Sequence, residues 1–262
     1  MLELNNVNIT FHKNTVNERR ALQNINLKLE EGDFVTVIGS NGAGKSTMLN
    51  AISGSSLIDN GKIILDGEDI SYRKEYKRAA KIGRLFQDPL KGTAPHMTIE
   101  ENLGLAYLRG KRRGIAGGIK KADEQVFRGL LSTLGLGLEE RLKTPVNLLS
   151  GGQRQALTLL MATIVTPKLL LLDEHTAALD PKTAKLVMEI TDRIIQENNI
   201  TTLMVTHNIK DALSYGNKTI VMSQGKILLV LSGKEREAMT VEKLMRLYSS
   251  TAEDALTDKM VL

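Results

Sequence analysis

An α/β fold is predicted for this chain of 262 residues by three observations. A mainly apolar run, residues 34–38, precedes a glycine-rich loop and a helical pattern, which is the order of a βα unit. The same alternation of apolar strands with helical sequence resumes at residue 169. Between these two regions, residues 93–146 are mainly helical in pattern. We therefore expect an α/β core that carries a helical insertion.

The first third of the chain is predicted to form strands before that βα unit. Apolar and polar residues alternate over 7–11 and again over 25–29, a pattern typical of half-buried strands. The sequence Glu-Gly-Asp at 31–33 predicts a turn before the buried strand. The helix after the glycine-rich loop is expected over 46–53, since Gly54 is a helix-stopping residue.

The predicted insertion contains two helices and a basic segment between them. Thr98 and Glu101 form a capping-box pattern that opens a helix through Leu108. Residues 109–121 are rich in lysine, arginine and glycine, which predicts a mobile, exposed loop. Contact of this loop with lipid headgroups is the alternative interpretation. A second helix is expected over 121–134.

The α/β pattern continues to the C-terminal part of the chain. Residues 169–172 and 201–205 are predicted to be buried strands. Between them, Asp180 is a suitable N-cap and Pro181 a suitable first residue for a helix that ends near Glu197. Two further elements are expected, a hairpin turn at 224–225 and an amphipathic helix over 240–248.

The composition excludes several classes of protein. Hydrophobic residues make up 42% and charged residues 25% of the chain, an ordinary globular balance. No run of about 18 apolar residues occurs, so no membrane-spanning helix is expected. The absence of cysteine excludes disulfides, cysteine-ligated zinc and thiol catalysis. The N-terminal residues lack the pattern of a signal peptide, so we expect a cytoplasmic protein.

The net charge of +5 leaves two interpretations open. One is a mildly basic surface without a specific partner, and the other is contact with anionic lipid headgroups or nucleic acid. Aromatic residues make up only 3% of the chain, which disfavours a surface that stacks on single-stranded bases. We therefore expect no nucleic-acid partner.

A glycine-rich segment between the predicted strand and helix matches the phosphate-binding loop pattern G-x-x-x-x-G-K-[ST]. Its residues are Gly39, Ser40, Asn41, Gly42, Ala43, Gly44, Lys45, Ser46 and Thr47. Glycines allow backbone N–H groups to converge on phosphate oxygens, and the following helix directs its positive end at the same anion. Lys45 supplies a charge for the β- and γ-phosphates, and the Ser46 hydroxyl is a suitable Mg²⁺ ligand. The loop predicts binding of Mg-ATP.

Two carboxylates, Asp173 and Glu174, directly follow the apolar strand 169–172. Ligands of open α/β sheets bind beyond the carboxyl ends of the strands, where the phosphate-binding loop also begins. Asp173 is expected to hold the Mg²⁺ shell, and Glu174 to take a proton from the attacking water. The alternative is an acidic turn without function.

Two further polar residues follow predicted strands. Gln87 comes after the strand 82–86 and is a candidate for contact with Mg²⁺ or with the attacking water. His207 comes after the strand 201–205 and is a candidate for a hydrogen bond to the γ-phosphate. Each of them alone is more often a surface or structural residue.

A second anion-binding element is predicted at Ser150, Gly151, Gly152 and Gln153. A serine hydroxyl and exposed glycine amides precede a helix expected from Gln153 to Val165, so the positive end of the helix lies beside them. A plain serine N-cap is the alternative interpretation. Two phosphate-binding elements in one chain indicate either a second nucleotide or a second subunit.

The sequence resembles the ATP-binding-cassette ATPases over nearly its whole length. The resemblance depends on five motifs in order, which are GSNGAGKST at 39–47, Gln87, LSGGQ at 149–153, LLLLDE at 169–174 and His207. It implies a P-loop NTPase (RecA-like) core with an N-terminal antiparallel β subdomain and an inserted α-helical subdomain. Within a single domain, 1–262, it implies that 1–92 and 158–262 form the β subdomain and core, and that 93–157 form the helical subdomain.

The same resemblance implies a homodimer that encloses two ATP molecules. Ser150, Gly151, Gly152 and Gln153 of one copy are expected at the phosphate held by Lys45 of the other copy. His207 is expected to be the switch histidine. Phe11 matches the aromatic residue that stacks on adenine, and residues 178–180 resemble the segment that links the two sites.

The resemblance further implies a membrane transporter. Residues 144–148 lack the acidic stretch of many exporters, and we expect no fused membrane domain. An importer is therefore expected, with separate transmembrane permease subunits and an extracytoplasmic substrate-binding protein, and with this chain at the cytoplasmic face of the membrane. The phrase at 173–180, with His175 where the family often has proline, resembles ATPases of amino-acid importers. An exporter of lipid, lipoprotein or drug and a non-transport ATPase are the alternatives.

Overall fold

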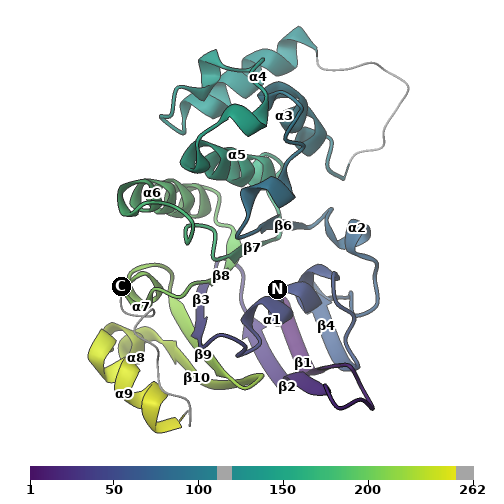
Figure 1. Cartoon of the computed structure of the whole chain (residues 1–262), viewed down its shortest axis with the longest axis vertical. Helices are drawn as coiled ribbons and strands as arrows, with labels where there is room; N and C mark the ends of the chain where they lie inside the picture. The colour runs from purple at the N-terminus through teal and green to yellow at the C-terminus, as the bar shows by residue number, and fades with distance from the viewer. Residues whose placement is uncertain (111–119, 252–262) are drawn as a thin grey trace. The chain divides into compact units, whose positions relative to one another are not determined.

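The computed structural model describes residues 1–110 and 120–251, which belong to two compact units (Figure 1). The first unit takes Met1–Arg78 and Ile200–Leu262, and the second unit takes Ala79–Asn199. The predicted helical subdomain, 93–157, lies inside the second unit, which also includes two strands and a long helix. Within the described residues, no helix is long and apolar enough to cross a membrane.

The first unit contains an antiparallel sheet with the strand order β2-β1-β4-β5. Its strands are β1 (Leu2–Phe11), β2 (Arg19–Leu29), β4 (Asn60–Leu65) and β5 (Glu68–Asp69). Leu2 pairs with Leu29 on one side and with Leu65 on the other, and all three side chains are buried. The predicted alternation is confirmed, except that Phe11 at the end of β1 is 40% exposed.

Four more strands of the first unit lie in the order β10-β9-β3-β8. They are β3 (Phe34–Gly39), β8 (Thr201–Val205), β9 (Lys218–Ser223) and β10 (Lys226–Ser232). β3 is parallel to both β8 and β9, whereas β10 pairs with β9 through the predicted hairpin turn. Every residue of β3 is buried, as expected for a central parallel strand. The helices of this unit are α1 (Lys45–Ser53), α2 (Glu75–Arg78), α7 (Ile209–Ser214), α8 (Gly233–Glu237) and α9 (Val241–Thr251).

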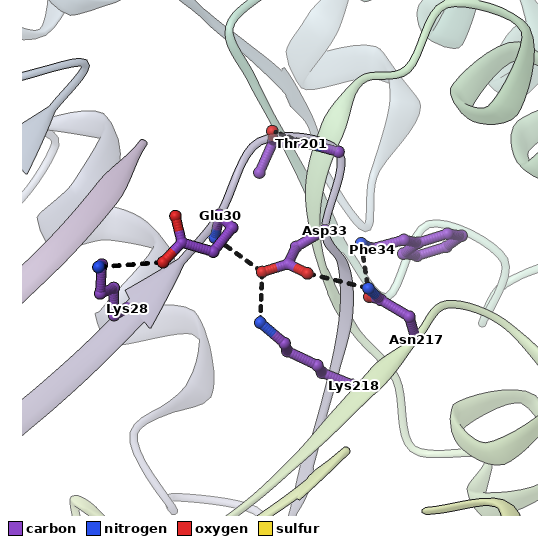
Figure 2. A network of polar contacts seen from close by, with 8 residues as sticks. Lys28, Glu30, Asp33, Phe34, Thr201, Asn217 and Lys218 are labelled. Carbon is purple, nitrogen blue, oxygen red and sulfur yellow. Dashed lines mark hydrogen bonds and ion pairs between the residues drawn. The ribbon is translucent and has the colours of Figure 1, made fainter. Parts of the chain in front are cut away.

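A polar network holds the turn at the start of β3 (Figure 2). The Asp33 carboxylate accepts hydrogen bonds from Lys218 Nζ at 2.6 Å, Asn217 Nδ2 at 2.9 Å and Glu30 N at 2.7 Å. Burial raises the pKa of Asp33, but these hydrogen bonds outweigh it and bring the pKa below its ordinary value. The Asn217 side chain also accepts from the backbone of Phe34. These contacts fix the end of β3 that is opposite the glycine-rich loop.

The second unit contains the parallel strands β6 and β7 together with α-helices and short 3-10 helices. β6 pairs with β7 from Ile82, opposite Leu169, to Leu85, opposite Leu172. The elements are β6 (Ile82–Leu85), η1 (Pro89–Gly92), α3 (Ile99–Tyr107), α4 (Lys121–Ser132), η2 (Leu138–Glu140), η3 (Val146–Leu148), α5 (Gly151–Thr163), β7 (Leu169–Asp173) and α6 (Pro181–Glu197). Residues 111–119 of the predicted basic loop lie outside the described residues.

Capping residues begin the helices of this unit where the sequence predicts. Thr98 and Glu101 form a reciprocal capping box at α3. Asp180 caps α6, with Pro181 in its first turn. Buried Asn102 on α3 bonds to the backbone of Ala94 through both of its amide atoms, which holds the chain that leads into the helix.

Candidate functional site

The glycine-rich loop connects β3 to α1 in the first unit, as predicted. Gly44 is the residue before α1 and has a φ of 101°, a left-handed conformation that favours glycine. A Cβ on Gly39 would lie 2.3 Å from the Met222 carbonyl oxygen of β9, so no larger residue fits there. Because the loop carries no bulky side chain at these points, its backbone is free to follow the outline of a phosphate group.

Lys45 is the first residue of α1, and its side chain is 5% exposed. Its Nζ donates to the carbonyl oxygens of Gly39 at 2.6 Å and Ser40 at 3.1 Å. The ammonium group therefore folds back over the loop, where it can exchange a carbonyl oxygen for a phosphate oxygen.

The β9–β10 hairpin supports this loop. The Gly225 N–H donates to the Ala43 carbonyl at 2.9 Å, and the Gly225 carbonyl accepts from Gln23 N at 2.8 Å. A Cβ on Gly225 would lie 2.7 Å from the Ala21 carbonyl oxygen, so the hairpin approaches β2 closely. The shape of the loop thus depends on a turn that is remote in sequence.

Phe11, the last residue of β1, pairs with Arg19, the first residue of β2. Both are exposed. Arg19 Nη2 donates to the carbonyl oxygen of Gly42 at 2.7 Å. The sequence alone singles out Phe11 but not Arg19, because this contact joins segments that are distant in the chain.

His207 follows β8 in the first unit and is half-buried. The preceding residue, Thr206, donates its N–H to Val37 of β3, and the next residue, Asn208, caps α7 with its side chain. The histidine therefore lies between two anchored residues at the carboxyl end of a strand.

In the second unit, Asp173 is the last residue of β7, and Glu174 follows with a φ of 47°. A positive φ is uncommon for a residue with a side chain, and it turns the chain sharply at this point. The Arg84 guanidinium lies 3.8 Å from the Asp173 carboxylate and 4.5 Å above the ring of Phe86. Arg84 was not predicted from the sequence.

His175 is buried at 3% exposure and contacts Thr191 of α6 through Nε2 at 3.2 Å. The Thr191 hydroxyl donates to the Val187 carbonyl, so the imidazole Nε2–H is the donor in this contact. Burial lowers the pKa of His175 to about 4, which keeps the ring neutral. The residue next to Glu174 is thereby tied to helix α6.

Gln87 is exposed and lies two residues after the end of β6. The next residue, Asp88, caps the short helix η1 through the N–H of Leu90. The amide of Gln87 is therefore presented from a bend between two regular elements.

Ser150, Gly151, Gly152 and Gln153 form the N-terminus of α5. Ser150 Oγ accepts from Gln153 N, and the Gln153 side chain accepts from Ser150 N, each at 3.2 Å. Ser150 and Gly151 are exposed, but the expectation of an exposed glycine was wrong for Gly152, which is buried. A Cβ on Gly152 would lie 2.2 Å from the Thr183 methyl group, because α6 packs against this turn.

The predicted site residues thus form two groups, each held within one unit. In the first unit are Phe11, the loop Gly39–Thr47 and His207, and in the second unit are Gln87, Asp173, Glu174 and the Ser150 turn. The oxygen donors of Ser46, Gln87 and Asp173 are of the hard type that Mg²⁺ prefers. Among the described residues, no cluster of three or more histidine, aspartate or glutamate side chains could hold a metal by itself.

The chain matches the family model described as "ABC transporter" over residues 22–177. It is 45% identical over 248 residues to a tyrosine transport ATP-binding protein of Clostridioides difficile, covering 95% of this chain and 98% of the relative. It is 32% identical over 257 residues to a phosphonates import ATP-binding protein of Trichodesmium erythraeum, covering 95% and 97%.

Solved structures are similar as well. A dimeric ATP-binding cassette in a post-hydrolysis state with ADP and Pi superposes with a TM-score of 0.76 at 31% identity, covering 88% of this chain and 98% of that chain. A nucleotide-free ATP-binding cassette gives a TM-score of 0.73 at 26% identity, covering 90% and 93%.

Proposed function

Because the chain belongs to the ABC transporter family and is an ATP-hydrolysing subunit of that family, we propose that it powers the import of an amino acid. The observation that carries this proposal is the 45% identity to a tyrosine transport ATP-binding protein, which extends over nearly the full length of both chains. Relatives named for the import of phosphonates, spermidine/putrescine and Fe(3+) ions support import over export.

The proposed hydrolytic site combines the two groups of residues on one nucleotide. The loop Gly39–Thr47 binds the phosphates, with the Lys45 ammonium on the β- and γ-phosphates, and Phe11 stacks on the adenine. Ser46, Gln87 and Asp173 would hold Mg²⁺, which neutralises charge on the phosphates when it is bound.

Glu174 is proposed to accept a proton from the attacking water, and His207 to donate a hydrogen bond to the γ-phosphate. The positive φ of Glu174 and the anchored neighbours of His207 support these roles, since each holds its side chain at a fixed point of the backbone.

Two copies of the chain are proposed to form the working ATPase. Ser150, Gly151, Gly152 and Gln153 of one copy would contact the nucleotide held by Lys45 of the other. The exposure of Ser150 and Gly151 at the N-terminus of α5 supports this arrangement, because a helix N-terminus attracts phosphate.

The proposed partners are separate transmembrane permease subunits and an extracytoplasmic substrate-binding protein, with this chain at the cytoplasmic face of the membrane. No nucleic-acid partner is proposed. The test is to purify the chain with the permease that co-purifies with it and reconstitute both in lipid vesicles. We expect the binding protein loaded with an amino acid, tyrosine being the first to examine, to stimulate both ATP hydrolysis and uptake.

The matched control for this experiment is Glu174→Gln, which should abolish uptake without loss of the complex. Export of substrate from the cytoplasmic side of the membrane would refute the proposal as stated. Uptake of polyamine or phosphonate in place of amino acids would refute it as well. A chain that hydrolyses ATP at the same rate with every candidate permease and binding protein would do so as well.

A further inference from the structure

The Arg19 side chain lies on the phosphate-binding loop. Its Nη2 donates to the Gly42 carbonyl at 2.7 Å. Gly42 has a φ of 82°, and a Cβ on it would lie 2.4 Å from this same nitrogen. The guanidinium therefore occupies the space that a side chain at position 42 would fill.

The position of Arg19 in the β1–β2 ladder sets its direction. Arg19 pairs with Phe11, so both side chains are on the same face of the sheet. Arg20 pairs with Thr10 and is therefore on the opposite face. Arg19 thus connects the residue proposed to stack on adenine with the loop proposed to bind the phosphates, which is the path that a bound nucleotide would follow.

The charge of Arg19 is available to an anion. Within 1–110 and 120–251, no carboxylate forms an ion pair with its guanidinium. Arginine has five N–H donors, and the Gly42 carbonyl accepts a hydrogen bond from one of its nitrogens, Nη2. Planar guanidinium groups bind phosphate through paired hydrogen bonds.

We propose that Arg19 is a further nucleotide-binding residue, which donates hydrogen bonds to the phosphate chain of bound ATP from the side of β2. This inference rests on the proposed role of the loop Gly39–Thr47. Arg19 supplies a second cation next to Lys45, and its contact with Gly42 holds it in place before the nucleotide arrives.

The experiment is calorimetric titration of MgADP and MgATP into the full chain and its variants, with Glu174→Gln as the background for MgATP. Arg19→Ala should weaken binding of both nucleotides by about tenfold, since hydrogen bonds to charged groups have energies of this order. Arg20→Ala is the matched control and should change affinity by less than about twofold. The loss at Arg19 should shrink in high salt, because screening weakens an exposed charge.

The melting temperature of the nucleotide-free protein distinguishes a nucleotide-binding role of Arg19 from a role in loop structure alone. The proposal expects Arg19→Ala to leave that temperature unchanged, and Arg19→Lys to recover part of the affinity. Unchanged affinity in Arg19→Ala, an equal loss in Arg20→Ala, or a loss that coincides with a lower nucleotide-free melting temperature would overturn it. Lys45→Ala is the reference: if it also binds at the wild-type level, the proposed role of the loop fails, and the inference fails with it.

Discussion

Glu174 has a backbone conformation that few residues with side chains adopt. A φ of 47° in the left-handed region is unfavourable by about 1 kcal/mol for a residue with a Cβ. The turn continues with a hydrogen bond from Ala177 N to the Glu174 carbonyl, and it contains buried His175. The local strain is therefore balanced by contacts that hold the backbone of this turn at the end of β7.

If Glu174 is the base, Glu174→Gln should reduce ATP turnover by about a hundredfold or more, because an amide cannot accept the proton. MgATP binding should persist, and an ATP-dependent dimer should accumulate. Phosphate release and light scattering measure the two effects. Near-normal turnover in this variant would show that the base is another residue.

His175 predicts a dependence of stability on pH. Its pKa falls from an ordinary 6.5 to about 4 on folding, so the unfolded chain binds a proton at a pH where the native chain does not. The free energy of unfolding should therefore decrease as the pH falls below about 6.5, by about 2 kcal/mol between about pH 7.5 and about pH 5. Urea unfolding at these two pH values measures the change. His175→Gln should lose this part of the dependence, and an unchanged slope in the variant would contradict the assignment.

At the scale of the elements, two arginines close the C-terminal ends of helices in the first unit. Arg78 donates to the carbonyls of Ala51 and Ile52 in α1, and burial lowers its pKa from the ordinary arginine value. Arg236 of α8 donates to the carbonyls of Ala212 and other residues at the end of α7. A positive charge at a helix C-terminus is favourable, and it satisfies carbonyl groups that have no partner within the helix. These two helices follow the phosphate-binding loop and His207.

Arg236→Ala should lower stability by about 2 kcal/mol, because it removes the part-buried hydrogen bonds to the carbonyl oxygens of Leu213 and Tyr215. Thermal unfolding followed by circular dichroism measures the effect. Lys234→Ala on the same short helix is the control, because Lys234 is exposed, and it should be nearly neutral. Equal melting temperatures for the two variants would refute the capping role of Arg236.

Several helix starts were predictable because their signals are local, although α5 begins at Gly151 and not at the expected Gln153. Thr98, Ser150 and Asp180 each cap a helix through residues three positions later, so the pattern is visible in the sequence. The contacts of Arg19 and Arg236 were not predictable in this way. Each joins segments that only the tertiary fold brings together, and no sequence period identifies such a partner.

At the scale of the whole molecule, the strands and helices around the glycine-rich loop and after residue 169 followed from the sequence pattern, whereas β4, β5 and α2 were not predicted. The P-loop NTPase fold is confirmed by the similar structures. The pairing of strands was not visible in the pattern. β3 lies between β8 and β9, which follow it by more than a hundred residues, and apolar periodicity indicates burial but not neighbours. The roles of the site residues stay predictions at this scale, because they depend on ATP and on a second copy.

Ser150→Arg tests the proposed dimer. A long cation at the N-terminus of α5 should block the approach of the other copy and its nucleotide, while single-copy MgATP binding stays intact. Light scattering with MgATP in the Glu174→Gln background should show loss of the dimer. Ser132→Arg, the same substitution at the exposed end of α4, should leave the dimer unchanged. An ATP-dependent dimer that persists in Ser150→Arg would refute the shared site.

The support of Ala43 by Gly225 has a consequence for how the protein matures on the ribosome. The loop proposed to bind phosphate is synthesised early, but the turn that supports it and both strands that flank β3 are synthesised late. A nascent chain that stops before residue 200 has the loop sequence without the strands β8 and β9 and the Gly225 turn that support it. We therefore expect affinity for nucleotide to arise late in translation, once the chain is nearly complete.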